Sequence, residues 1–212
     1  MITVWGRATS SNVQIVMWAL AEIGLDCERH DVGGAFGKTD TPEYIAMNPN
    51  RLVPTIQDGE LTLWESAAIV RYLGAQYGNE QFWPSDPKLR AGIDKWAEWS
   101  KTSFGPAVLA QIFTQLIALP AEKRDPKVLE AGIARVATLA PMIDKRLSET
   151  PFLGGQNLAF ADCIFGTLLY RYFTMPFERV ATPNLEDYYN RLGERPAYRK
   201  HAMVSYESLR AK

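Results

Sequence analysis

Apolar residues follow two different periods along this chain. Residues 2–5 form a β-rich run that stops at Gly6, and an apolar repeat with helical spacing then continues to Gly24. Residues 27–32 fit a second strand, and a short helix is expected around residues 42–47. The pattern therefore predicts the order strand, helix, strand, helix for the opening part of the chain.

A hairpin and a helix complete this first part. Residues 53–57 and 61–63 are apolar runs on either side of Asp58-Gly59, and Asp-Gly between two such runs is a strong hairpin signal. After the second run, apolar residues recur every three or four positions up to Gly78, which predicts one more helix. The pattern thus predicts a βαβαββα unit over residues 1–78.

The rest of the chain shows helical spacing almost throughout. Residues 79–87 form a connector with two prolines, which separates the first unit from the second. Helices are expected at residues 88–118, 126–148, 160–174, 184–193 and 196–209. The predicted fold class is an α/β unit followed by an all-helical unit over residues 88–212.

Charge and composition narrow the range of partners. The 212 residues carry 23 Lys and Arg against 24 Asp and Glu, and this net charge of -1 provides no basic field for nucleic acid or an anionic membrane. No apolar stretch has the length of a membrane span, and the start lacks the pattern of an export signal. Cys27 and Cys163 occur in no metal-binding or dithiol spacing, so no metal site is expected. A cytoplasmic protein that binds small molecules or proteins is predicted.

Two segments carry a resemblance to a known family. The run N-P-N-R-L-V-P-T-I at residues 48–56 is followed by the Asp-Gly turn and by L-W-E-S-A-A-I at residues 63–69. In order and spacing these runs resemble the signature of the cytosolic glutathione transferases, and Ser10-Ser11-Asn12 stands where the Ser-type classes carry their catalytic serine. The resemblance covers the whole chain. It implies a thioredoxin-like domain that binds glutathione as co-substrate and a helical domain that lines the site of a hydrophobic electrophile.

The resemblance assigns glutathione binding to Leu52, Val53 and Pro54. A proline that opens a strand cannot donate a hydrogen bond to the ladder, and a cis bond before it, as in the family, would turn the backbone of Val53 toward the cysteinyl part of the ligand. A plain edge proline is the alternative that the residues alone leave open.

Glu65 and Ser66 begin a predicted helix directly after a strand. The backbone N–H and hydroxyl of Ser66 can receive a carboxylate at the positive end of that helix, while Glu65 can meet an amine. Capping of the helix is the common alternative for such residues. Together with Val53-Pro54, the pair favours binding of the γ-glutamyl head of glutathione.

Ser10 is expected to activate the thiol of glutathione. A thiol with a pKa of about 8.5 is only a few per cent thiolate at neutral pH, and a hydroxyl that donates to the sulfur at a helix N-terminus lowers that pKa. Ser11 and Asn12 are the alternatives, because either serine could instead cap the first helix. Single substitutions would separate the three.

The chain departs from the family where the glycyl carboxylate of glutathione is bound. Many relatives carry a basic pair where this chain has Thr39 and Asp40, and a basic or amide residue where it has Leu52. Lys38 and Arg51, each one position away, are the candidates for this carboxylate. Solvated surface charge is the alternative for both.

A second departure concerns the folding of the helical domain. The family has Ser or Thr three residues before a buried Asp, whereas this chain has Ala159 before Asp162. Loss of that capping hydroxyl is expected to cost about 1 kcal/mol unless Asn157 or water takes its place.

The expected function is transfer of glutathione, as a thiolate, to a hydrophobic electrophile in detoxification by a cytoplasmic homodimer. One alternative is a glutathione-dependent thiol or peroxide oxidoreductase, which would normally need a cysteine at the start of the first helix. The other is a non-catalytic interaction module of the same fold. Retention of Glu65-Ser66 and of Ser10 weighs against that second alternative.

Overall fold

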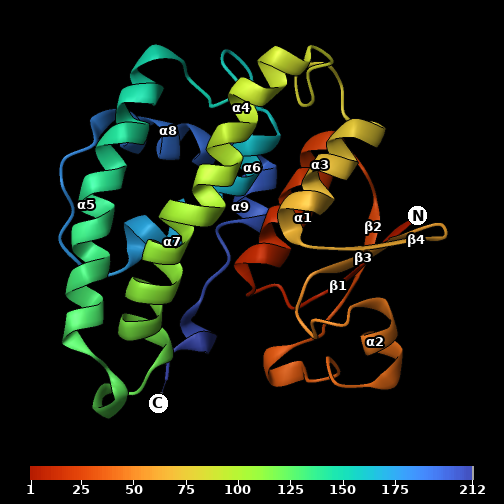
Figure 1. Cartoon of the computed structure of the whole chain (residues 1–212), viewed down its shortest axis with the longest axis horizontal. Coiled ribbons are helices and arrows are strands. Elements are labelled where there is room, and N and C mark those ends of the chain that lie inside the picture. Colours follow the sequence, from red (N-terminus) through yellow and green to blue (C-terminus); the bar gives the residue numbers. More distant parts are fainter. Residues whose placement is uncertain (212) are drawn as a thin grey trace.

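A four-stranded mixed sheet forms the centre of the first unit. The computed structural model describes residues 1–211 and is drawn in Figure 1. The strands are β1 (Ile2–Trp5), β2 (Cys27–His30), β3 (Thr55–Asp58) and β4 (Leu61–Trp64), in the order β2-β1-β3-β4. β1 is parallel to β2 and antiparallel to β3, and β3 and β4 form the hairpin predicted around Asp58-Gly59.

Three helices accompany the sheet. α1 (Ser11–Ile23) and α3 (Ser66–Tyr77) lie together on one side of it, and α2 (Pro42–Met47) lies on the other side (Figure 1). Apolar side chains from the sheet, α1 and α3 form one cluster, in which Val4 and Ile56 are fully buried. Burial of this cluster against α1 and α3 fixes the register of the strands, since a slip of one residue would turn each apolar side chain to the opposite face.

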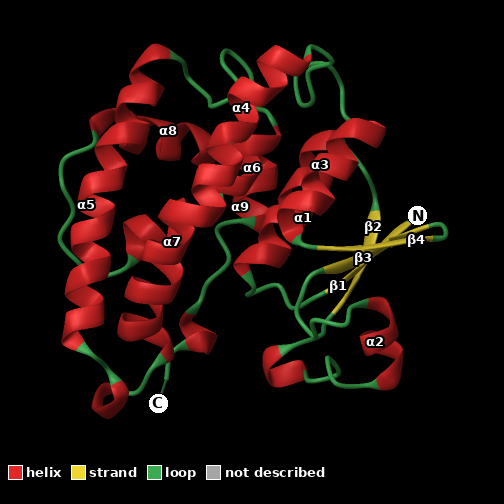
Figure 2. Ribbon diagram, viewed as in Figure 1, coloured by secondary structure: helices red, strands yellow, loops and turns green. Residues whose placement is uncertain are grey.

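Helices make up nearly all of the second unit (Figure 2). The α-helices are α4 (Pro87–Trp99), α5 (Pro126–Glu149), α6 (Phe160–Gly166), α7 (Leu169–Thr174), α8 (Pro183–Gly193) and α9 (Pro196–His201). Wider turns continue α4 as η2 (Ser100–Phe104) and η3 (Pro106–Ala118), and short 3-10 turns occur at Gly34–Phe36, Ala121–Lys123 and Glu207–Leu209. The predicted fold class is confirmed. No helix of residues 1–211 combines the length and the apolar composition that a membrane crossing needs.

The helix predicted at residues 88–118 changes its winding after Trp99. η2 and η3 are π-helical, and the N–H of Gly105 accordingly donates to the carbonyl of Ser100, five residues earlier. A Cβ on Gly105 would lie 2.8 Å from that carbonyl oxygen, so glycine is the residue that fits this turn. The wide turns begin immediately before Lys101, where the helix passes the first unit.

Three predicted boundaries were wrong. The strand predicted at residues 27–32 ends at His30, because its partner strand ends at Trp5, opposite His30. The helix predicted at residues 160–174 is divided into α6 and α7, and the hydroxyl of Thr167 donates to the carbonyl of Cys163 at the break. The helix predicted at residues 196–209 ends at His201. There the N–H groups of Ala202 and Met203 both donate to the Tyr198 carbonyl, which closes the last turn.

A buried carboxylate anchors the start of α6, and the Asp162 N–H, which a capping hydroxyl would receive, donates instead to the Ala159 carbonyl at 2.9 Å. Asp162 is fully buried, and its Oδ1 accepts hydrogen bonds from the Leu153 N–H at 2.8 Å and the Tyr188 hydroxyl at 2.7 Å. Its Oδ2 accepts from the N–H groups of Ala159 at 2.8 Å and Gly154 at 3.3 Å. Burial raises the pKa of the Asp162 carboxyl, while these four donors act in the opposite direction.

The first helix of the sheet unit also contacts the helical unit through an ion pair. Glu22 on α1 accepts hydrogen bonds from Arg195 Nε at 2.8 Å and Nη2 at 2.5 Å, and from the indole N–H of Trp18 at 2.7 Å. Arg195 directly precedes α9, whose Tyr198 packs edge-on against Trp18. These contacts hold α1, and hence the loop before it, against the helical unit.

Candidate functional site

The loop before β3 is held by two buried polar side chains of the α2 region. The Tyr44 hydroxyl donates to the Leu52 carbonyl at 2.6 Å, and the Asn48 amide donates to the same carbonyl at 2.9 Å. Both side chains also lie within hydrogen-bond distance of the Thr55 hydroxyl, on the far side of Pro54. The Val53–Pro54 peptide bond is cis, as the resemblance implies. The loop is therefore anchored on both sides of Val53.

Glu65 and Ser66 join β4 to α3. Glu65 has a φ of 70°, in the left-handed region, and is exposed, whereas Ser66 is 1% exposed and begins the helix. The Glu65 side chain makes no capping hydrogen bond to α3. No hydrogen bond from the Glu65 carboxylate thus closes the start of α3.

Side chains from three distant segments meet at the N-terminus of α3. The Ser66 hydroxyl donates to Asn12 Oδ1 at 3.0 Å. Lys101 Nζ donates to the same Asn12 oxygen at 2.8 Å and to Ser66 Oγ at 3.2 Å. Burial lowers the pKa of Lys101, and the negative charge of Glu65 acts in the opposite direction. The first and second units thus share one polar cluster.

Three small cavities adjoin this cluster, and Asn12 lines all of them. One of 40 Å³ is lined by Asn12, Asn48, Asn50, Leu52, Val53, Pro54, Glu65 and Ser66. One of 260 Å³ is lined by Arg7, Ser10, Asn12, Gly33, Gly34, Thr39, Arg51, Leu52 and Val53. One of 250 Å³, mostly apolar, is lined by Asn12, Ile15, Ser100, Lys101, Gly105, Pro106, Leu109, Ala110, Ile164 and Leu168.

The three candidates for thiol activation occupy different surroundings. Ser10 is the N-cap residue of α1, but its side chain makes no capping hydrogen bond and it lines the 260 Å³ cavity. Ser11 lines none of the three cavities. Asn12 Oδ1 is already engaged by Ser66 and Lys101. Of the two serines, only Ser10 therefore lies at a cavity.

The candidates for the glycyl carboxylate also differ. Arg51 lines the 260 Å³ cavity, whereas Lys38 is exposed and lines none of the three cavities. Arg7 lines the same cavity as Arg51, and its Nε is buried without a hydrogen-bond partner in residues 1–211. Arg171 on α7 contacts the loop before α1, where it donates a hydrogen bond to the Thr9 carbonyl at 2.6 Å. Burial, and next the nearby charge of Arg7, lowers the pKa of Arg171 to about 10.

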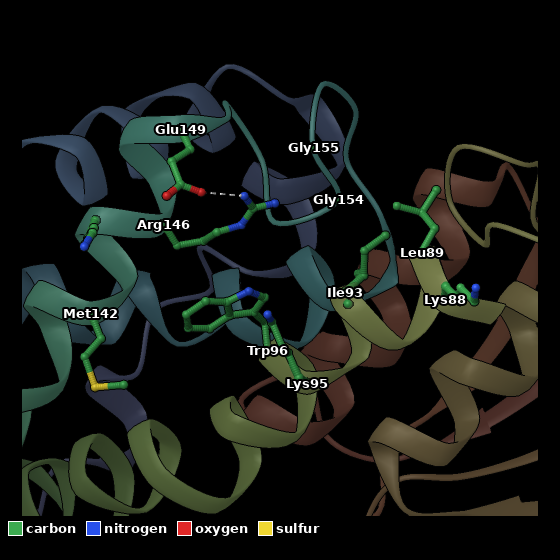
Figure 3. A pocket seen from close by; sticks show the side chains of 12 residues that line it. Lys88, Leu89, Ile93, Lys95, Trp96, Met142, Arg146, Glu149, Gly154 and Gly155 are labelled. Carbon is green, nitrogen blue, oxygen red and sulfur yellow. Dashed lines mark hydrogen bonds and ion pairs between the residues drawn. The ribbon is translucent and has the colours of Figure 1, made fainter. Parts of the chain in front are cut away.

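A larger cavity lies elsewhere, between α4 and α5 (Figure 3). Its volume is 660 Å³, and its lining includes Leu89, Trp96 and Met142 together with several basic side chains. Arg146 on its wall pairs with Glu149 at 3.1 Å. None of the residues singled out by the sequence motifs lines it.

Sequence reasoning missed Lys101 and gave no individual role to Asn48. Asn48 belongs to the run of residues 48–56 that carries the resemblance. A buried amide needs hydrogen-bond partners, and this requirement was the signal that could have identified Asn48 as an anchor of the loop. Lys101 gave no such signal, because it lies 89 residues from Asn12 and 35 from Ser66 within a segment of helical spacing.

Both units of the chain match models of a known protein family. Residues 1–75 match the family model "Glutathione S-transferase, N-terminal domain", and residues 107–196 match "Glutathione S-transferase, C-terminal domain". Glutathione S-transferase GstB of Escherichia coli (strain K12) is 37% identical over 206 residues, which cover 96% of this chain and 99% of that protein.

Solved structures of glutathione S-transferases also match the fold of this chain. The theta class glutathione S-transferase from Xanthomonas axonopodis pv. citri, with glutathione bound, matches with a TM-score of 0.91 and 42% identity over 96% of this chain and 98% of that one. Maize glutathione S-transferase I, in complex with an atrazine glutathione conjugate, matches with a TM-score of 0.85 and 28% identity over 95% and 96% of the two chains. The resemblance in the sequence is thereby confirmed, and this chain belongs to the glutathione S-transferase family.

Proposed function

We propose that this protein transfers glutathione to a hydrophobic electrophile. The observation that carries the proposal is the meeting of Ser10, Asn12, Val53 and Ser66 around adjoining cavities. These residues come from three separate segments of the chain. The family resemblance assigns glutathione contacts to Ser10, Val53 and Ser66, and gives Asn12 as an alternative to Ser10. The binding of glutathione by the Xanthomonas relative and of a glutathione conjugate by the maize relative supports the same co-substrate here.

In the proposed mechanism each part of glutathione has its own partner. The backbone of Val53 pairs with the cysteinyl backbone, and Glu65 receives the α-amine. The Ser66 N–H receives the α-carboxylate at the start of α3, together with the Ser66 hydroxyl once its proton turns from Asn12 Oδ1 to the ligand. The 260 Å³ cavity beside Arg51 takes the glycyl end. The carboxylate of Glu65 and the positive end of the α3 dipole at Ser66 together fix the direction of this end of the ligand.

Ser10 then stabilises the thiolate. Its hydroxyl donates a hydrogen bond to the sulfur at the N-terminus of α1, and the thiol proton passes to solvent. A sulfur lone pair forms a bond to the electrophilic carbon, and for an aryl halide the carbon–halogen bond breaks to release halide. The mostly apolar 250 Å³ cavity beside Asn12 suits a hydrophobic electrophile.

The two alternatives receive less support. A thiol or peroxide oxidoreductase would use a cysteine near the start of α1, and Ser10, Ser11 and Asn12 occupy those positions. An interaction module would have no need for a free serine hydroxyl, a cis proline and an acidic residue around a shared set of cavities.

Calorimetric titration with glutathione tests the proposal. Wild-type protein is expected to bind, and Ser66→Ala is expected to weaken binding about tenfold or more, because a hydrogen bond to a charged group contributes roughly 1.5–3 kcal/mol. Ser103→Ala is a matched control, since Ser103 lies on the helical unit and lines none of the three cavities. Absence of binding by the wild type at millimolar glutathione would move the protein to the interaction-module class.

We also propose that the enzyme is a cytoplasmic homodimer. Reduced glutathione and the free thiols of Cys27 and Cys163 suit a reducing compartment. Leu89 and Met142, 52% and 49% exposed, flank the cavity between α4 and α5, and Tyr77 is exposed on α3. Members of the family pair α3 of one subunit with the long helices of the other, and exposed apolar patches commonly mark such contacts.

The dimer gives a measurable expectation. The wild type is expected to have twice the mass of one chain in light scattering, and the double substitution of Leu89 and Met142 by Glu is expected to produce monomers, because it buries two charges at the contact. The matched control replaces Lys127 and Glu130 on α5 by Ala, outside this cavity. A wild type that is monomeric at micromolar concentration would contradict the dimer.

A further inference from the structure

Lys101 is placed against the proposed glutathione site by the helical unit. It lies in η2, where the helix adopts π-type turns, and its side chain crosses to the first unit to reach Asn12 and Ser66. π-type turns inside α-helices are often found at functional sites. A Cβ on Gly105 would lie 2.8 Å from the Ser100 carbonyl oxygen, so the π-type turn requires glycine at this position.

Lys101 forms no ion pair within residues 1–211. Its two hydrogen-bond partners, Asn12 Oδ1 and Ser66 Oγ, are neutral oxygens. No Asp or Glu oxygen of residues 1–211 lies within 4.0 Å of its Nζ. An ammonium has three N–H donors, so one remains for a ligand. A partly desolvated cation with a free donor is a binding group for an anion.

Two opposite charges lie near Ser66, because Lys101 donates to its hydroxyl and Glu65 directly precedes it at the start of α3. Glu65 is close enough for its charge to be the largest one acting on Lys101. An α-amino acid head group carries one positive and one negative group on the same α-carbon. A carboxylate and an ammonium around one helix N-terminus are complementary to such a zwitterion, provided that the ligand amine faces Glu65 and its carboxylate faces Lys101.

We propose that Lys101 binds the α-carboxylate of the γ-glutamyl head of glutathione, together with Ser66. This rests on the proposed function of the site. The helical unit then contributes directly to binding of the co-substrate. One ligand carboxylate oxygen takes the free N–H donor of Lys101, and the Asn12 contact holds the lysine side chain in place.

The test compares two ligands on two variants. The ligands are glutathione and 4-aminobutyryl-cysteinyl-glycine, which lacks only the α-carboxylate of the head group. Lys101→Met is expected to weaken the binding of glutathione about tenfold, because the lost charge pair is only partly buried and its strength lies between those of exposed and buried pairs. The affinity of the same variant for the analogue is expected to stay within about twofold of the wild-type value. Lys127→Met removes one exposed lysine from α5 and is expected to leave binding of both ligands unchanged.

The outcomes separate binding of the carboxylate by Lys101 from a role of this lysine in the fold or at the thiol. Equal weakening of both ligands by Lys101→Met would overturn the proposal, because the lysine would then act on the thiol or on the fold rather than on the carboxylate. Unchanged binding of glutathione would overturn it as well. Failure of the wild type to bind glutathione would instead refute the proposed function, so the two failures are distinguishable. Thermal unfolding of Lys101→Met, measured in parallel, checks that the fold is retained.

Discussion

Replacement of Asp162 by Asn is expected to lower the free energy of unfolding by roughly 2–6 kcal/mol, because two of the four buried groups that donate to it would lose their acceptor. Both carboxylate oxygens of Asp162 accept hydrogen bonds, two on each oxygen. An amide keeps one acceptor oxygen and turns an NH2 group toward two of the donors. Buried N–H or O–H groups would then lose their acceptor without access to water, and each such loss costs roughly 1–3 kcal/mol.

Thermal unfolding followed by circular dichroism measures this effect. For a chain of this length the expected loss corresponds to a decrease of roughly 10 °C in Tm. Tyr188→Phe is the matched control, because it removes one donor to Asp162 and leaves the three backbone donors in place. That variant should lose only about 1.5–3 kcal/mol. Equal losses in Asp162→Asn and Tyr188→Phe would refute the role assigned to the backbone donors.

The local pattern was sufficient to predict the sheet unit. Two apolar runs with Asp58-Gly59 between them, and a helical repeat before and after, specify a hairpin between two helices because the turn signal and the periods all lie within a short stretch of chain. The candidate site residues Val53 and Ser66 were identified by the resemblance to the glutathione transferases and not by this pattern. They lie at the junctions between these elements, where backbone groups are left without partners and can bind a ligand.

Contacts across the chain could not be predicted in this way. The absence of a hydroxyl at Ala159 is visible in the sequence, but the donors that Leu153, Gly154 and Tyr188 bring to the buried Asp162 carboxylate are not. Helical spacing likewise gave residues 88–118 as one helix and gave Lys101 no special place. Its partners depend on how the two units pack, which no single-helix period encodes.

Ser10→Ala is expected to reduce kcat/KM for conjugation of an aryl halide about 10- to 100-fold. The hydrogen bond to a thiolate is charge-assisted, and such bonds contribute roughly 1.5–3 kcal/mol. The hydroxyl is suited to this role because it makes no capping bond to α1 and lines the 260 Å³ cavity beside Val53. Ser11→Ala is the matched control, and a change within about twofold is expected, because Ser11 lines none of the three cavities.

The dependence on pH separates thiol activation from a structural role of Ser10. A donor to the sulfur stabilises the thiolate, so the wild-type complex should have a thiol pKa below the ordinary value of about 8.5, and Ser10→Ala should raise it. The rising limb of the pH profile then moves to higher pH, and the variant recovers activity as the medium becomes alkaline.

Asn12→Ala should instead weaken glutathione binding without this shift, since its Oδ1 holds Ser66 and Lys101. A shifted profile in Asn12→Ala with an unshifted one in Ser10→Ala would transfer the activating role to Asn12.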